Sequence, residues 1–345
     1  MIRRPADRVA DSATFALRVL DMHPLGPMEL LRSATDRPNR QTLRTVVTTR
    51  RGTEHVAVKV ILGPTEAVAA SFAWEHRVTN SLWTIAAGLV RDRELPRNPI
   101  VPVLHETPIA TEDAVVSVSR FIPDSGSPLT ARAWGETLGL LHVIGSTDGA
   151  RELLRSHPVA NALSGLSAVT FLEALDRPDH PFRNDEKLVL EFVHVLRQRT
   201  LQAAHLDPEP LLAHRDFHVL NCLTTDEGGL AIDWQEAGWG NRSDDFAWIH
   251  LFVERCGGDQ QIMKAAQRAY TRAAHRTCPN DDQIRASGQV RELLCLGFSL
   301  QNAYRSPQHL EECLIELPVL HDQDAVTDEW HMLFNPAIFE PGLVL

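Results

Sequence analysis

The sequence predicts an α+β fold of two lobes, a small antiparallel β-sheet lobe followed by a larger, mainly α-helical lobe. Strand-like segments fill the first part of the chain, and helical patterns fill the part that follows. Residues 123–128 separate the two parts and read PDSGSP, a composition typical of linkers. A chain of 345 residues is long enough for both lobes. We expect an N-terminal extension, a β-rich lobe and an α-helical lobe over residues 1–27, 28–122 and 123–345.

Composition and charge narrow the classes of protein to consider. Hydrophobic residues make up 43% and charged residues 23% of the chain, as in ordinary globular proteins. The net charge of -11 disfavours a nucleic-acid partner, which needs a basic face, and mildly favours a cationic ligand. The five cysteines are scattered, and no apolar run approaches the roughly 20 residues of a membrane span. We therefore expect a cytoplasmic protein without nucleic-acid or membrane partners.

Two charged residues stand out in the first lobe. Lys59 interrupts an apolar strand, and Glu75 lies on the apolar side of the following helix. A lysine on an antiparallel strand commonly faces solvent, whereas a carboxylate on an apolar helix face requires a cation. The sequence leaves open whether Glu75 and Lys59 form a buried pair or whether Glu75 pairs at the surface with Lys59 or Arg77. Strands are expected over residues 28–34, 43–49, 56–62, 100–104 and 114–118, with helices over 11–20 and 64–82.

The second lobe contains a predicted β-hairpin within residues 214–240. Apolar residues 220–223 and 230–232 flank a polar run that ends in two glycines. This arrangement would bring Asp216, Asn221 and Asp233 to one end of the hairpin, and such oxygen-bearing side chains suit a general base and a hard-cation site. The rest of the lobe is expected to be helical, with helices over residues 130–144, 171–175, 185–204, 244–256, 259–276, 281–305 and 309–317.

These motifs resemble the protein kinase-like fold, and within it the aminoglycoside phosphotransferase/choline kinase family of small-molecule kinases. The resemblance covers residues 28–305. It is carried by the segments Ala57-Val58-Lys59, by Glu75, by His214-Arg215-Asp216 with Asn221, and by Ile232-Asp233-Trp234. Asp216-Phe217-His218 and Ile-Asp-Trp are similar to the antibiotic-kinase branch and differ from the protein-kinase branch. Two departures are a glycine-free loop over residues 35–42 and Asn241, which stands where aspartate is frequent.

The resemblance implies a role for each matching residue. Asp216 would accept or orient the proton of the substrate hydroxyl, and Asn221 and Asp233 would hold Mg²⁺ on the nucleotide phosphates. Lys59 would neutralise the α- and β-phosphates, and Glu75 would aim it. The backbone of residues 119–121, from Ser119 to Phe121, would bind the adenine of the nucleotide.

Three further polar residues accompany the motif. His214 is expected to brace the loop, and Asp245 to receive hydrogen bonds from it. His218 either contacts substrate or braces the loop. A metal site made by His214 and His218 is disfavoured, because the residues between them are typical of a loop and not of a helix.

The expected activity is Mg²⁺-dependent transfer of the γ-phosphate of ATP or GTP to a hydroxyl of a small molecule. An antibiotic of the aminoglycoside type, and hence antibiotic resistance, is the leading expectation. Acidic residues in the second lobe suit a polyamine, although carboxylates on helices are usually a solvated face; they are Glu236, Asp244, Glu254 and Asp259. The alternatives are a metabolic kinase of choline, sugar or amino-alcohol type and a regulatory, nucleotide-binding pseudokinase. Residues 321–345 either cover the substrate or pack on the lobe.

Overall fold

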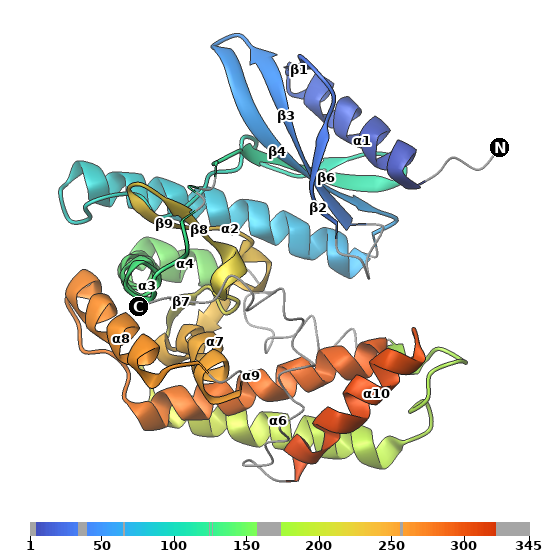
Figure 1. Ribbon diagram of the computed structural model, residues 1–345, viewed down its shortest axis with the longest axis vertical. Coiled ribbons are helices and arrows are strands. Elements are labelled where there is room, and N and C mark those ends of the chain that lie inside the picture. Colours follow the sequence, from blue (N-terminus) through green and yellow to red (C-terminus); the bar gives the residue numbers. More distant parts are fainter. Residues whose placement is uncertain are drawn as a thin grey trace. The chain divides into compact units, whose positions relative to one another are not determined.

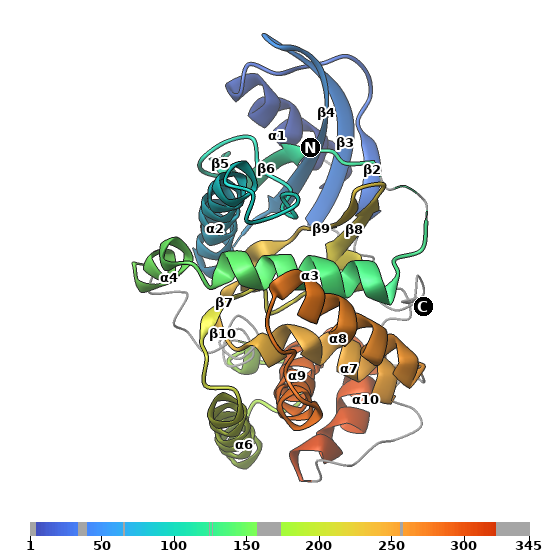
Figure 2. The same ribbon diagram turned by 90° about the vertical axis from the view of Figure 1, so that its left-hand side faces the viewer.

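The computed structural model describes residues 5–33, 40–64, 66–123, 125, 127–156, 174–255 and 258–321 (Figures 1 and 2). The chain forms two compact units. The first comprises Met1–Ser125 together with Ile232–Gln235, and the second comprises Gly126–Ala231 together with Glu236–Leu345. The short segment Ile232–Gln235 thus belongs to the unit of the N-terminal sheet.

The first unit is built on a six-stranded antiparallel sheet. β4 and β6 pair at its centre, so that Lys59 lies directly opposite Ser117. β2 pairs with β3 outside the main strand order. The strands are β1 (His23–Pro24), β2 (Glu29–Ser33), β3 (Arg40–Thr49), β4 (Gly52–Leu62), β5 (Ile109–Ala110) and β6 (Ala114–Arg120).

Helices cover both faces of this sheet. Side chains alternate along β4, so apolar residues lie on both faces and each face packs against a helix. Val56, Val58 and Val60 join one buried cluster with residues of α1 (Pro5–Val19). Ile61 points to the other face, where it packs with Phe72 of α2 (Glu66–Arg91). Lys59 shares the face of Ile61 and is therefore covered by α2 instead of facing solvent.

Four of the five strands expected in this unit form, and the strand expected over residues 100–104 does not. Within these residues, Ile100 and Val103 make only isolated bridges, that of Val103 to Ser119. Pro102 has no N–H to donate to a ladder, which explains the loss. The two-residue strands β1 and β5 are too short to produce a pattern in the sequence. The helix expected over residues 11–20 begins at Pro5 as α1, and the helix expected over 64–82 continues to Arg91 as α2.

The second unit is mainly helical, as expected. Side-chain caps mark several helix starts, including Thr130, whose hydroxyl accepts a hydrogen bond from the Ala133 amide. The short helix α4 was missed, and the helix expected over residues 171–175 lies largely outside the described residues. The helices are α3 (Ala131–Gly145), α4 (Asp148–Arg155), α6 (Glu186–Leu206), α7 (Arg242–Arg255), α8 (Gln260–Ala274), α9 (Asp281–Asn302) and α10 (Pro307–Glu316).

Helix α3 organises this unit by packing closely on its neighbours, with α8 beside it (Figure 2). A side chain at Gly135 would lie 2.2 Å from the carbonyl oxygen of Ala266, so only glycine permits this approach. The predicted hairpin also lies on α3. A side chain at Gly229 would come within 2.4 Å of the Thr137 hydroxyl.

The hairpin consists of β8 (Cys222–Thr225) and β9 (Gly228–Ala231), joined by Asp226 and Glu227. Its strands reach into the polar run that was expected to be a loop. A second pair, β7 (Leu211–Ala213) with β10 (Gly238–Gly240), was not predicted. Among the described residues, no helix is both long enough and apolar enough to cross a lipid bilayer.

Candidate active site

A buried cluster of charged side chains lies in the first unit around Lys59. Nζ of Lys59 lies 3.1 Å from Oε2 of Glu75 and 2.9 Å from Oδ1 of Asp233. The Lys59 side chain is 16% exposed and that of Glu75 is 10% exposed. Of the pairings that the sequence left open, the structure contains the buried one. One ammonium group is therefore shared by two carboxylates.

Arg40 adds a second cation to this cluster. Its guanidinium lies 3.4 Å from Oδ2 of Asp233 and donates to the side-chain oxygen of Gln235 at 3.2 Å. Burial raises the pKa of Glu75, while the charges of Lys59 and Arg40 oppose that rise. No local pattern in the sequence indicates a role for Arg40, which stands in a polar run and matches no motif.

Asp233 owes its position to an unusual backbone conformation. It has a φ of 62°, in the left-handed region, where aspartate is tolerated better than most residues. It follows β9 and precedes the 3₁₀ turn η3 (Trp234–Glu236). The turn carries the Asp233 carboxylate into the cluster with Lys59.

Asp216 and Asn221 form a separate group in the second unit. Nδ2 of Asn221 donates to the backbone oxygen of Asp216 at 2.8 Å and to its carboxylate at 3.1 Å. Asn221 ends the 3₁₀ turn η2 (Val219–Asn221) and is buried. The amide nitrogen thus faces Asp216, and the amide oxygen Oδ1 points elsewhere. The aspartate side chain is 26% exposed and can reach a ligand.

Asp245 holds the loop that carries Asp216. Its fully buried carboxylate accepts hydrogen bonds from the backbone amides of His214 and Arg215 and contacts Nε2 of His142 at 3.0 Å. Arg215 has a φ of 65°, a conformation that costs on the order of 1–3 kcal/mol for such a residue. The expectation that Asp245 receives hydrogen bonds from this loop is confirmed.

His142 bridges Asp245 and Tyr270. A carboxylate can only accept, so Nε2 of His142 carries the hydrogen that Asp245 receives. Nδ1 lies 3.0 Å from the Tyr270 hydroxyl oxygen. Burial opposes ionisation of Asp245, but the hydrogen bond and charge of His142 bring its pKa below the ordinary value. Neither His142 nor Tyr270 was singled out in the sequence.

Both loop histidines brace the backbone. Nδ1 of His214 accepts from the Asp216 amide at 3.4 Å, and Nδ1 of His218 accepts from the Leu220 amide at 3.2 Å. The ring of His218 also packs edge-on against Trp248 and lies 3.7 Å from the Asp216 carboxylate. Its position therefore combines bracing with closeness to Asp216.

The residues expected to bind adenine lie at the end of β6. Ser119 pairs with Ala57 across the sheet. The amide of Phe121 donates to the carbonyl of His55 at 3.0 Å, and so is already engaged. The loop over residues 35–42, which lacks glycine, lies largely outside the described residues.

Asn221 and Asp233, which belong to different units, each carry an oxygen of the kind that a hard cation prefers. Carboxylate and amide oxygens are the ligands that Mg²⁺ prefers, and hydrogen bonding to Asp216 orients the Asn221 amide so that its oxygen is the atom left for a metal. Within the described ranges no group of three or more acidic, histidine or cysteine side chains could hold a metal ion.

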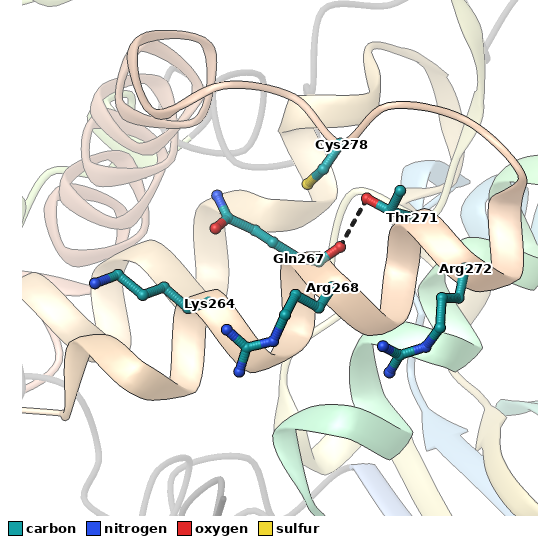
Figure 3. Close-up of a pocket in the computed structure, with 6 residues that line it drawn as sticks. All are labelled: Lys264, Gln267, Arg268, Thr271, Arg272 and Cys278. Carbon is teal, nitrogen blue, oxygen red and sulfur yellow. Dashed lines mark hydrogen bonds between the residues drawn. The ribbon is translucent and has the colours of Figure 1, made fainter.

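A hollow of about 450 Å³ lies on the surface of the second unit (Figure 3). Lys264, Arg268 and Arg272 project from successive turns of α8, and Cys278 lies across from Thr271. The hydroxyl of Thr271 donates to the backbone oxygen of Gln267 at 2.9 Å. None of the residues expected in the active site lines this hollow.

The acidic residues proposed to attract a polyamine have structural contacts instead. Asp244 is half-buried and accepts hydrogen bonds from Ser287 and the Asn241 amide. Asp259 caps α8, and Glu254 accepts from Gln260. Glu292 and Glu316 are two other acidic residues of this unit, and both are buried. Burial raises the pKa of Cys295 on α9, and negative charge from Glu316, Asp216 and Glu292 raises it further, while Arg291 opposes this.

Comparisons with known proteins agree on the type of fold and family. A model of the phosphotransferase enzyme family matches residues 105–279, just over half of the chain. A comparison with curated protein sequences finds no significant match.

Three solved structures illustrate the likeness in fold. An amicoumacin kinase in complex with AMP-PNP and Ca²⁺ is 12% identical, with a TM-score of 0.58 over 95% of this chain and 99% of that chain. A microcompartment-associated aminopropanol kinase is 14% identical, with a TM-score of 0.56 over 89% and 94%. The streptomycin–ATP ternary complex of an aminoglycoside phosphotransferase is 14% identical, with a TM-score of 0.51 over 93% and 99%. The expected α+β kinase-like fold is confirmed.

Proposed function

Because the chain belongs to the phosphotransferase enzyme family, we propose that it transfers the γ-phosphate of ATP or GTP to a hydroxyl group of a small molecule. The observation that carries this proposal is the Lys59 ammonium bound between Glu75 and Asp233. A lysine so fixed can neutralise nucleotide phosphates without reorganising during the reaction. Phosphoryl transfer depends mainly on such positioning and charge neutralisation.

Asp216 is the group proposed to receive the acceptor proton. Its carboxylate is partly exposed, and the hydrogen bond from Asn221 fixes its orientation. One carboxylate oxygen can therefore point toward an incoming hydroxyl. Asn221 and Asp233 would hold Mg²⁺, which supplies charge neutralisation on the phosphates when it is bound.

The proposed acceptor is a hydroxylated amine, with aminoglycoside-type antibiotics as the leading class. Support comes from the surroundings of Cys295, which lies within electrostatic reach of the carboxylates of Asp216, Glu292 and Glu316 and of the opposing charge of Arg291. Such negative potential around the proposed base favours an acceptor that carries an amine. Buried Arg199 lies close enough to Glu292 to sense its charge, so part of this potential is already balanced.

A panel of acceptors tests the proposal. Purified protein is mixed with Mg-ATP or Mg-GTP and with aminoglycosides, amino alcohols, choline, sugars or no acceptor, and nucleotide consumption and phosphorylated product are both measured. The expected result is acceptor-dependent turnover that Asp216→Asn lowers by roughly 100-fold or more, with nucleotide binding retained.

Asp226→Asn is the matched control, because Asp226 is an exposed aspartate in the turn of the hairpin. It should behave as wild type. Nucleotide binding without turnover on any acceptor would favour the pseudokinase alternative, and turnover only on amino alcohols or choline would favour a metabolic kinase.

A further inference from the structure

Two neighbouring residues of α2 contact two neighbouring residues of the sheet. Lys59 on β4 and Ser117 on β6 are direct cross-strand partners, so their side chains share the face that α2 covers. Glu75 binds Lys59, and Nε2 of His76 lies 2.7 Å from the hydroxyl oxygen of Ser117. Both helix residues are buried. A pair of polar contacts therefore joins helix and sheet side by side.

This arrangement restricts the rotation of α2 about its own axis. Successive residues of an α-helix are about 100° apart around the axis, so Glu75 and His76 can reach the sheet together only over a narrow range of rotation. The apolar contact one turn earlier, between Phe72, Ile61 and Val115, is non-directional and resists rotation less. The hydrogen bond to Ser117 is directional and supplies this restriction.

The ring of His105 packs against the ring of His76. The two ring centroids are 4.5 Å apart. Nε2 of His105 accepts from the Val118 amide at 2.9 Å, so it carries no hydrogen and the ring is neutral, with Nδ1 contacting the Thr107 carbonyl. Asn80 of α2 donates to the His105 carbonyl at 3.0 Å. The His76 ring therefore lies between Ser117 and a histidine that is itself fixed to β6.

We propose that His76 and Ser117 are positioning residues that hold Glu75 against Lys59. They act through the orientation of α2 and touch neither nucleotide nor acceptor. This inference rests on the proposed function, because it assigns His76 and Ser117 a role in preparing Lys59 for the nucleotide phosphates. Loss of their hydrogen bond allows α2 to rotate, and Glu75 then holds Lys59 less well.

The test is a double-mutant cycle between Ser117→Ala and Glu75→Gln, measured as kcat and KM for Mg-ATP with a saturating acceptor. Ser117→Ala is expected to lower kcat/KM about fivefold, the effect of one buried hydrogen bond. The same substitution should have no further effect in the Glu75→Gln background, because the pair it positions is already broken. Ser117→Thr, which keeps the hydroxyl, should restore activity.

Two further variants guard against a general loss of folding. His76→Phe combined with Ser117→Ala removes both polar partners while filling the same space, and should fold and show the same loss. Asn98→Ala removes a hydrogen bond from Asn98 to the Trp83 carbonyl of α2 and should leave kcat/KM unchanged.

The outcomes separate the two proposals. Equal losses from Ser117→Ala in both backgrounds, or no loss in either, would overturn the positioning role while leaving the proposed function in place. A Glu75→Gln variant with wild-type kinetics would also overturn the positioning role alone. A wild-type protein that phosphorylates no acceptor would overturn the proposed function, and the positioning role with it.

Discussion

Lys59 and Asp233 form an ion pair at 2.9 Å, although 174 residues separate them in the sequence. Lys59 therefore compensates Asp233 as well as Glu75, and Arg40 adds a second positive charge on the other Asp233 oxygen. A nucleotide with its cation would enter a cluster in which charges are already matched. Under the proposed function, Lys59 would exchange its contact with Asp233 for one with phosphate, which would leave the Asp233 carboxylate available to hold the cation.

Lys59→Ala should abolish most activity while the protein still folds. We expect kcat/KM for Mg-ATP to fall by at least roughly 100-fold, because the ammonium group is fixed in advance of reaction. Folding should survive because Arg40 still compensates Asp233. Steady-state kinetics and thermal unfolding followed by circular dichroism check both statements. Lys187→Ala, on the exposed start of α6, is the matched control. Unchanged turnover in Lys59→Ala would exclude the assigned role.

Arg40→Met should weaken nucleotide binding less than Lys59→Ala does. Arg40 contacts Asp233 at the longer distance of 3.4 Å and also binds Gln235, so it orients the Asp233 segment and shares its charge with Lys59. We expect the Kd for Mg-ATP to rise about 3- to 10-fold, in line with the loss of a partly buried charge-assisted hydrogen bond. Titration calorimetry with Mg-ATP measures the change. Arg51→Met, at an exposed turn, should bind as wild type. If Arg40→Met weakened nucleotide binding as much as Lys59→Ala does, Arg40 would have to bind phosphate directly.

Sequence reasoning found the residues that belong to short motifs and missed those defined only by the tertiary structure. Lys59 and Glu75 were recognised because each breaks a local apolar pattern. Arg40 and His142 contact residues 193 and 103 positions away, and no local pattern records such a pairing. The extra strands β1 and β5 have two residues each, which is too short for alternation to be visible.

Asp245→Asn should impair the loop of Asp216 and the stability of the second unit together. The two carboxylate oxygens of Asp245 accept hydrogen bonds from the His214 and Arg215 amides and from His142. Asparagine has a single side-chain oxygen and cannot accept all of them in the same way. The left-handed conformation of Arg215 would lose part of its support. We expect a loss of about 2–4 kcal/mol in the free energy of unfolding and a fall in kcat that exceeds the change in nucleotide KM.

Urea unfolding and steady-state kinetics test this prediction. Asp282→Asn, in the exposed first turn of α9, is the control and should change neither quantity. A stable Asp245→Asn variant with normal kcat would show that the loop holds its conformation without the buried carboxylate.

The buried histidine pair should make stability fall as the pH is lowered below neutrality. Burial, with a contribution from His105, lowers the pKa of His76 to about 3, compared with 6.5 for an ordinary histidine. Between these values the unfolded chain binds a proton that the folded protein does not, so stability rises with pH across this window and is fully present above 6.5. His76 alone contributes a slope of at most about 1.4 kcal/mol per pH unit.

Urea unfolding of wild type and of the His76→Phe, Ser117→Ala double variant at pH values from 7 to 5 measures this contribution. The variant should show a shallower decline, since it lacks the histidine but keeps every other titrating group. The raised pKa of Glu75 acts in the opposite sense, because stability from that group falls as pH rises, and the comparison cancels it to the extent that both proteins share it. His205→Gln, an exposed histidine near the end of α6, should leave the slope of wild type unchanged. Parallel slopes for wild type and the double variant would mean that His76 does not remain neutral as the pH falls, and that its ring is more accessible to protons than its contacts with Ser117 and His105 imply.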